Sequence, residues 1–198
     1  MFINGFDILW DEVDDYVADI QSIRSIDQLT FSKPVTFFCG ENGSGKSTLL
    51  EALAIKNGLN PEGGTRNYNF STYDSYSDLH NHMRLWRSRK PDWMYFLRAE
   101  SFYNVATKEM EYSGVFSERY HDQSHGQSFF SVLMKQTNKN GLYLLDEPEA
   151  ALSCQNQLAL LYLIQSCVKQ NCQFIIATHS PILLGFPGAQ ILSFDEGK

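Results

Sequence analysis

Short runs of apolar residues alternate with helix-like stretches along most of this chain of 198 residues. Each apolar run is bounded by glycine, proline, asparagine or charged residues, as is typical of buried strands. The expected strands cover residues 35–39, 93–97, 142–145, 174–177 and 191–194. The expected helices cover residues 46–56, 126–137 and 151–169. Strands alternating with helices predict an α/β fold with a mainly parallel sheet flanked by helices.

The segment from about residue 60 to 125 departs from this alternation, and we expect it to form a small helical insertion within a single domain covering residues 1–198. Residues 67–78 interleave four aromatic side chains with small polar ones. We interpret them as a loop, and a stacking platform is the alternative. Residues 83–90, MRLWRSRK, form a basic cluster. Its favoured interpretation is a solvated helix face, and contact with nucleic acid or a partner protein is the alternative.

Composition limits the classes of function. With 43% hydrophobic and 20% charged residues, the chain can bury one good core. The longest apolar run, residues 158–164, falls short of the roughly 20 residues that span a bilayer. The start of the chain is acidic where a signal peptide would be basic, so we expect no membrane span and a cytoplasmic location. The net charge of −7 opposes indiscriminate binding to nucleic acid or anionic membranes.

The sequence shows no metal-ligand pattern of cysteine and histidine. The four cysteines, Cys39, Cys154, Cys167 and Cys172, form no CxxC pair. At least three of them fall in segments predicted to be buried, so we expect reduced core thiols. His80 and His82 are two residues apart and would point in different directions on a helix.

The most informative stretch is GENGSGKST, which follows the strand VTFFC and precedes a helix. It satisfies the pattern GxxxxGK[ST] in the context that a phosphate-binding loop requires. The glycines let backbone N–H groups point at phosphate oxygens, and the helix N-terminus adds partial positive charge. Lys46 is expected to reach the β and γ phosphates and Ser47 to coordinate Mg²⁺. A glycine-rich turn with a surface lysine is the alternative. The nucleotide-binding candidates are Gly40, Glu41, Asn42, Gly43, Ser44, Gly45, Lys46, Ser47 and Thr48.

A second stretch, GLYLLDEPEAALS, ends an apolar run in two adjacent acids. Asp146 at the end of a buried strand is suited to hold Mg²⁺ through water, and Glu147 can polarise the water that attacks the γ phosphate. A carboxylate pair of this kind is also common as a solvated loop entry. The phosphate-binding loop earlier in the chain favours the catalytic interpretation.

A third stretch, FIIATHSP, places His179 after another buried strand. A lone histidine at a strand end is usually a satisfied polar residue. Here the strand is expected to lie beside the Asp146 strand, and both would end at the sheet edge where α/β proteins bind ligands. We therefore expect His179 near the γ phosphate.

The stretch DQSHGQSFF contains a capping box. Ser124 and Gln127 have the spacing with which both side chains satisfy free N–H groups at the start of a helix. A purely structural cap explains both residues. The position of this helix, before the Asp146 strand, leaves open a second role at a ligand.

The order GENGSGKST, SHGQS, LLDEPEAALS and THS resembles the head of ATP-binding-cassette (ABC) ATPases. The resemblance is specifically to small soluble ATPases of the AAA/SMC-like ABC group, over roughly residues 26–194. On this resemblance residues 40–48 correspond to Walker A, 142–147 to Walker B and 149–153 to the D-loop. His179 corresponds to the switch histidine, so the implied catalytic residues are Lys46, Glu147 and His179, with Ser47 and Asp146 at the metal. The implied signature residues are Ser124, His125, Gly126 and Gln127.

The sequence departs from the family pattern at several positions. Gln123 stands for the signature leucine and His125 for its first glycine. After the strand at 93–97, Glu100 is the candidate substitute for the Q-loop glutamine. The candidates for an aromatic that stacks on adenine are Phe6, Tyr16 and Phe31.

The resemblance also implies a mechanism and partners. Two copies would pair head to tail around two ATP, with the signature of one copy over the γ phosphate of the other, and hydrolysis would drive an unidentified protein partner. Nucleic-acid maintenance or defence is the expected setting. One alternative is an ATP-gated dimerisation module with negligible turnover. Another is the nucleotide-binding subunit of a transporter, which SFFSVLMKQTNK after the signature and EAALS in the D-loop disfavour.

Overall fold

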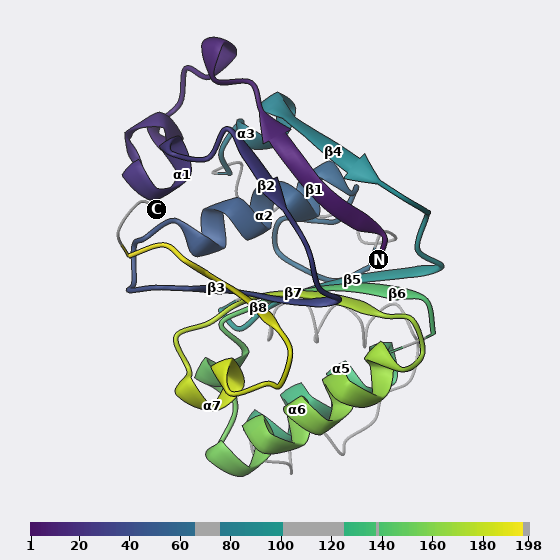
Figure 1. Cartoon of the computed structure of the whole chain (residues 1–198). Helices are drawn as coiled ribbons and strands as arrows, with labels where there is room; N and C mark the ends of the chain where they lie inside the picture. Colours follow the sequence, from purple (N-terminus) through teal and green to yellow (C-terminus); the bar gives the residue numbers. More distant parts are fainter. Residues whose placement is uncertain (66–75, 101–124, 138, 196–198) are drawn as a thin grey trace.

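The structure is a computed structural model, and it describes residues 1–65, 76–100, 125–137 and 139–195. Its centre is a five-stranded sheet in which every pairing is parallel (Figure 1). In spatial order the strands are β5 (Trp93–Arg98), β6 (Gly141–Asp146), β7 (Gln173–Ala177), β3 (Val35–Cys39) and β8 (Gln190–Ser193). The predicted parallel α/β sheet is confirmed, and every predicted strand is present to within two residues at either end.

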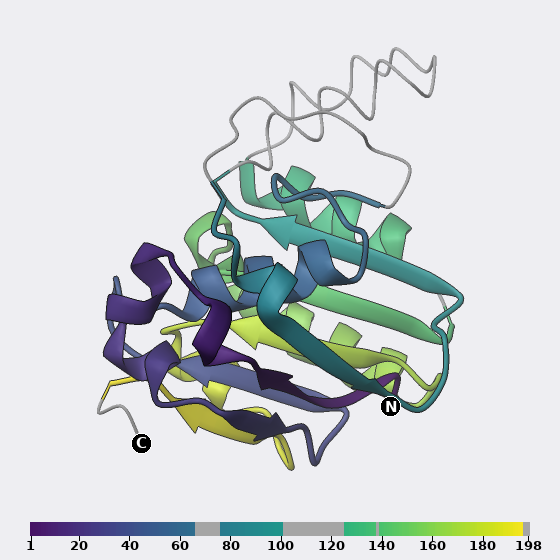
Figure 2. The same ribbon diagram turned by 90° about the horizontal axis from the view of Figure 1, so that it is seen from above.

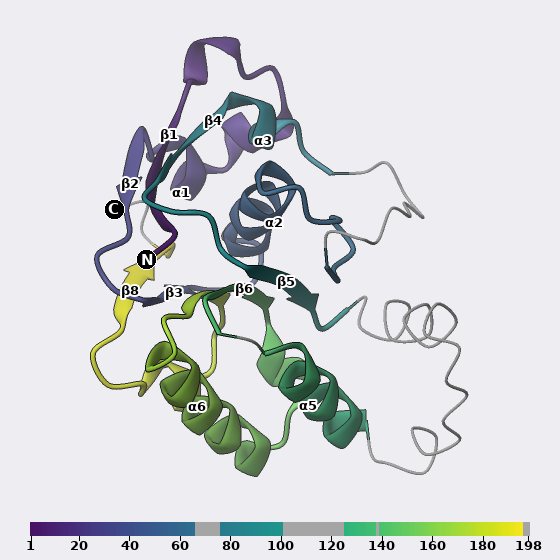
Figure 3. The same ribbon diagram turned by 90° about the vertical axis from the view of Figure 1, so that its right-hand side faces the viewer.

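Helices cover both faces of this sheet (Figures 1 and 3). One face carries α2 (Lys46–Lys56), and the other carries α5 (His125–Gln136), α6 (Cys154–Val168) and α7 (Pro181–Leu184). All six residues of β6 are buried, which explains why its sequence is apolar without alternation. Helix α6 begins later than predicted, because Pro148–Ala151 form the 3₁₀ turn η4. Ser153 then caps α6 by accepting a hydrogen bond from the Asn156 N–H.

A second sheet of three antiparallel strands lies over α2 (Figures 1 and 2). Its strands are β2 (Gln28–Thr30), β1 (Ile3–Ile8) and β4 (Met83–Arg87), in that order. The prediction of a helix face for the basic cluster is therefore wrong at residues 83–87, which pair with β1. The helix before it, α3 (Leu79–His82), has a single turn. Helix α2 is consequently enclosed between two sheets.

The connection between β1 and β2 packs against the loop that precedes α2. It contains the 3₁₀ turns η1 (Trp10–Glu12) and η2 (Tyr16–Asp19) and the short helix α1 (Gln21–Arg24). The Ser22 hydroxyl donates to the Ser44 carbonyl at 2.5 Å. A Cβ on Gly45 would lie 2.8 Å from the Ile23 side chain, so this contact requires glycine. The N-terminal segment thus buttresses the glycine-rich loop.

Two apolar cores lie on the two faces of the parallel sheet. The first fills the space between this sheet, α2 and the antiparallel sheet, and the second lies under α5 and α6. Among the described residues, no helix combines the length and the apolar character needed to cross a membrane. Cys167 and Cys172 are buried and Cys39 is half-buried, whereas Cys154 is exposed, in line with the expectation that at least three of the four lie in buried segments.

Candidate functional site

The loop between β3 and α2 curls around the amino end of the helix. Gly43 and Gly45 have φ of +82° and +88°, in the left-handed region that residues with a side chain rarely adopt. Gly45 is the N-cap of α2, so the turn ends where the helix begins. Free N–H groups at a helix start attract anions. The loop therefore has the backbone geometry that the sequence predicts for phosphate binding.

Lys46 turns back into this loop. The residue is only 3% exposed, and its Nζ donates to the Gly40 carbonyl at 2.7 Å and the Glu41 carbonyl at 2.6 Å. The ammonium group is thereby held at the concave side of the loop. A single cation enclosed by backbone is suited to bind an anion that enters there.

Ser47 and Asp146 join the helix start to the adjacent sheet edge. The Ser47 hydroxyl donates to Asp146 Oδ1 at 2.8 Å. Burial raises the pKa of Asp146 to about 6, although the Ser47 hydrogen bond and the Arg98 guanidinium oppose the shift. A hydroxyl and a carboxylate are both oxygen ligands, which Mg²⁺ prefers. The two side chains predicted to hold the metal are thus brought into contact.

The raised pKa of Asp146 predicts a pH-dependent stability. A folded pKa of about 6 against 3.8 means that folding disfavours the ionised carboxylate. Stability is therefore lost as pH rises from about 4 to about 6, by roughly 3 kcal/mol from this group. We expect Asp146→Asn to match the wild type near pH 4 and to exceed its free energy of unfolding near pH 7. Urea denaturation without divalent ions would measure the free energy of unfolding of both proteins at each pH. If the two values changed in parallel between about pH 4 and pH 7, the raised pKa of Asp146 would be refuted.

Arg98 and Glu51 belong to the site although the motifs do not contain them. Arg98 ends β5 and pairs in register with Asp146 on β6. Its Nε lies 3.4 Å from Asp146 Oδ2, and its Nη1 forms an ion pair with Glu51. Glu51 is on α2 one turn after Ser47. A cation at the end of a strand beside the Asp146 strand was the available signal, because parallel strands end at a common edge.

Glu147 follows Asp146 and lines the same pocket as Lys46 and Asp146. Its φ and ψ are 46° and 49°, a left-handed conformation that is uncommon for a residue with a side chain. Its N–H donates to the Ala177 carbonyl at 2.9 Å, which fixes the turn after β6. Such strained positions gather at functional sites.

His179 is placed differently from its two predicted neighbours. It is half-exposed, and its Nδ1 lies 3.3 Å from Glu149 Oε1. The same oxygen accepts hydrogen bonds from the Thr178 hydroxyl at 2.6 Å and the His179 N–H at 2.7 Å. His179 does not line the pocket that contains Lys46 and Asp146. The structure thus assembles Lys46, Ser47, Asp146 and Glu147, and it leaves His179 tied to Glu149.

The pocket that Lys46, Ser47, Asp146 and Glu147 line has a volume of about 650 Å³, a size that admits a nucleotide. Its polar lining comes from the glycine-rich loop, the ends of β5 and β6, and Glu100. Glu100 is highly exposed and lies 4.0 Å from Arg98 Nη2, so its expected Q-loop role stays a prediction. Phe6 and Phe31 are buried in the first core and cannot stack on a base there. Tyr16 is exposed and interacts with Thr48, so it alone of the three stays a candidate.

The predicted signature is described only in part. Ser124 lies outside the described residues, while the backbone of His125, Gly126 and Gln127 forms the first turn of α5. The helix therefore begins where the capping box predicts. The contact of the signature with a second copy stays a prediction.

A glycine-rich loop between a buried strand and a helix, facing a carboxylate at the end of a neighbouring strand, defines a P-loop nucleoside-triphosphatase fold. Comparisons with known proteins refine this class. Residues 18–81 match a family model described as an AAA domain, and residues 124–184 match one described as an AAA ATPase domain. An uncharacterized ABC transporter ATP-binding protein of Haemophilus influenzae is 28% identical over 183 residues, covering 79% of this chain and 68% of that protein. These matches confirm the resemblance to ABC-type ATPase heads.

Two solved structures show a limited similarity to this chain. One is a proposed metal-chelate type ABC transporter in an inward-facing conformation, with a TM-score of 0.49 and 16% identity over 86% of this chain and 72% of that one. The other is a nucleotide-free ATP-binding cassette from an ABC transporter, with a TM-score of 0.46 and 14% identity over 98% of this chain and 88% of that one.

Proposed function

We propose that this chain binds ATP with Mg²⁺ in the pocket between α2 and β6 and hydrolyses it. The contact between Ser47 and Asp146 supports this proposal most directly, because it brings two oxygen ligands together beside the buried Lys46. Magnesium, when bound, would neutralise charge on the phosphate oxygens. The loop N–H groups and the Lys46 ammonium would orient the β and γ phosphates.

The residues of the pocket have distinct roles in this proposal. Lys46 would exchange its loop carbonyls for phosphate oxygens. Glu147 would accept a proton from the water that attacks the γ phosphorus, and the bond to the β,γ-bridging oxygen would break to give ADP and phosphate. His179 is held by Glu149 outside the pocket lining, so it would have to turn toward the γ phosphate to aid this step.

Binding and turnover can be tested separately. Equilibrium dialysis of the purified protein is expected to show ATP retained in the presence of Mg²⁺, and a phosphate-release assay is expected to show hydrolysis. Retention without phosphate release would favour the ATP-gated dimerisation module. Failure to retain ATP would refute the proposal as a whole.

We further propose that two copies pair head to tail when ATP is bound, with residues 124–127 of one copy over the γ phosphate of the other. A helix start carries partial positive charge, so the amino end of α5 suits an anion. Cytoplasmic action on a protein partner, in nucleic-acid maintenance or defence, is the expected setting. Because the Haemophilus influenzae relative is described as an ABC transporter ATP-binding protein, a transporter subunit is the second candidate.

Replacing Ser124 by arginine tests the head-to-tail contact. A bulky side chain at this position is expected to block ATP-dependent dimerisation while leaving ATP binding by the monomer intact. Size-exclusion chromatography with ATP would measure the dimer. Gln165→Arg, on the exposed side of α6, is the control that adds the same side chain elsewhere. An unchanged dimer in Ser124→Arg would leave Ser124 as a helix cap alone.

A further inference from the structure

Two cationic side chains, Lys46 and Arg98, are among the described residues that line the pocket. Three acids, Glu100, Asp146 and Glu147, line it as well. Lys46 is enclosed by the glycine-rich loop. Arg98 lies beside Asp146, at the part of the pocket lined by Asp146 and Glu147, which we call the carboxylate end. The proposed metal position therefore already has a fixed positive charge beside it.

Contacts on two elements hold this charge in place. The Arg98 guanidinium pairs with Glu51 on α2 and lies beside Asp146 on β6, and its Nη1 also donates to the Pro61 carbonyl at 3.2 Å. The side chain is 21% exposed, so water screens it only partly. Glu51 itself is partly buried, at 14% exposure. Arg98 is thus a preorganised cation that links the helix carrying Ser47 to the strand carrying Asp146.

The charge of Arg98 has opposite effects on the two ligands of the pocket. ATP without a metal is an anion and would meet the carboxylates of Asp146 and Glu147, which Arg98 offsets. Mg²⁺ is a cation and would be attracted by the same carboxylates, an attraction that Arg98 weakens. A unit charge a few ångströms away in a half-buried site changes an equilibrium about tenfold or more. Both effects reduce the gain in ATP affinity that Mg²⁺ brings.

We propose that Arg98 sets the magnesium dependence of nucleotide binding, by supplying at the carboxylate end of the pocket part of the positive charge that the metal would otherwise bring. The inference rests on the proposed function, because it concerns the same pocket. Arg98 would determine how strongly the pocket prefers metal-bound ATP over metal-free ATP.

The test compares the dissociation constant of ATP in EDTA with that in saturating Mg²⁺, by isothermal titration calorimetry on the whole chain. Arg98→Gln is expected to raise the ratio of the constant in EDTA to the constant in Mg²⁺ about tenfold or more. Arg98→Lys keeps the charge, and its ratio is expected to stay near that of the wild type. A ratio that is unchanged or lower in Arg98→Gln would overturn the proposal and assign Arg98 to holding Asp146 in position.

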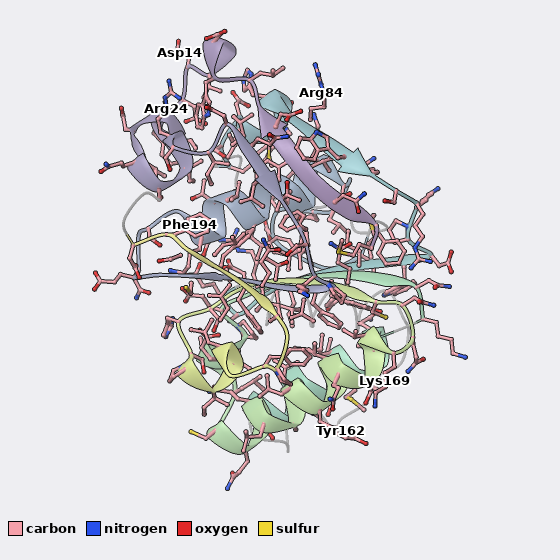
Figure 4. All side chains as sticks on the ribbon, in the orientation of Figure 1. Asp14, Arg24, Arg84, Tyr162, Lys169 and Phe194 are labelled. Atoms are coloured by element: carbon pink, nitrogen blue, oxygen red, sulfur yellow. The ribbon has the colours of Figure 1, made fainter. Side chains whose placement is uncertain are left out.

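Further variants separate charge from folding. Glu51→Gln removes a negative charge beside Arg98, so its ratio is expected to fall below that of the wild type. The double variant Glu51→Gln with Arg98→Gln removes one charge of each sign, and its ratio is expected to return toward the wild-type value. Arg84 is exposed on β4 (Figure 4), so Arg84→Gln removes a positive charge away from the pocket. Its ratio of dissociation constants is expected to equal that of the wild type.

These variants also distinguish the two levels of proposal. If Arg98→Gln does not fold, as thermal unfolding would show, an unchanged ratio in Glu51→Gln overturns the inference instead. If the wild type fails to bind ATP with Mg²⁺, the proposed function is wrong. If the wild type binds ATP with Mg²⁺ but neither Arg98→Gln nor Glu51→Gln changes the ratio, only the inference is wrong.

Discussion

Glu147→Gln is expected to slow ATP hydrolysis by roughly 10²-fold to 10⁴-fold while leaving ATP binding intact. The amide keeps the size of the side chain but cannot accept the proton of the attacking water. The contacts that support binding, at Lys46, Ser47 and Asp146, do not involve the Glu147 side chain. Single-turnover phosphate release would measure the slow step, and dialysis would measure binding.

The same variant is expected to accumulate an ATP-bound dimer, because the γ phosphate that joins the two copies is no longer removed. Size-exclusion chromatography with ATP and Mg²⁺ would detect it. Asp14→Asn, which removes an exposed acid between η1 and η2 (Figure 4), is the control for a lost carboxylate. Turnover equal to that of the wild type would remove Glu147 from the role of base.

The parts of the site that lie in continuous motifs were predictable from the sequence. GENGSGKST specifies a strand end, a curled loop and a helix start through residue types within the motif, although Ser22 and Ile23 also contact the loop. The proximity of Ser47 and Asp146 was expected, because both were predicted at the metal and a buried strand ending in an acid points to the sheet edge where the glycine-rich loop lies. Their direct hydrogen bond was not predicted. Local rules and sheet direction together were sufficient for the proximity alone.

The antiparallel sheet over α2 was not predicted, and its strands explain why. β1 pairs with β4, and these strands are far apart in the sequence, so no local pattern marks their pairing. β4 mixes Arg84 and Arg87 with apolar residues, which is also compatible with an amphipathic helix. The pairing of β4 with β1 and the packing of Met83 and Leu85 in the core around α2 favour the strand.

Side chains that act through tertiary contacts were also outside the reach of motifs. Arg98 becomes part of the site because β5 pairs with β6 and places Arg98 beside Asp146. The sequences of the two strands do not predict that they are neighbours. His179 shows the converse: it follows the predicted strand at the expected edge, but Glu149 holds it to one side of the pocket. A shared sheet edge predicts proximity, whereas competing partners decide orientation.

Lys46→Gln is expected to weaken ATP binding by roughly 10²-fold, because a charge-assisted contact to the triphosphate is lost. In the structure the Lys46 ammonium lies on the concave side of the loop and donates to the Gly40 and Glu41 carbonyls. Binding therefore exchanges two carbonyl oxygens for phosphate oxygens and requires little ordering of the side chain. A neutral amide cannot substitute, because it carries no charge to attract the triphosphate.

Isothermal titration calorimetry with Mg²⁺ would measure this loss. The variant keeps Gly43, Gly45 and the Ser22 contact to Ser44, so the loop is expected to stay folded without the Lys46 contacts. Lys169→Gln, at the exposed C-cap of α6 (Figure 4), removes the same charge far from the loop and is expected to bind as the wild type does. Equal dissociation constants for Lys46→Gln and Lys169→Gln would mean that the triphosphate does not bind in this loop. A large difference between them would tie nucleotide binding to the one ammonium that the glycine-rich loop encloses.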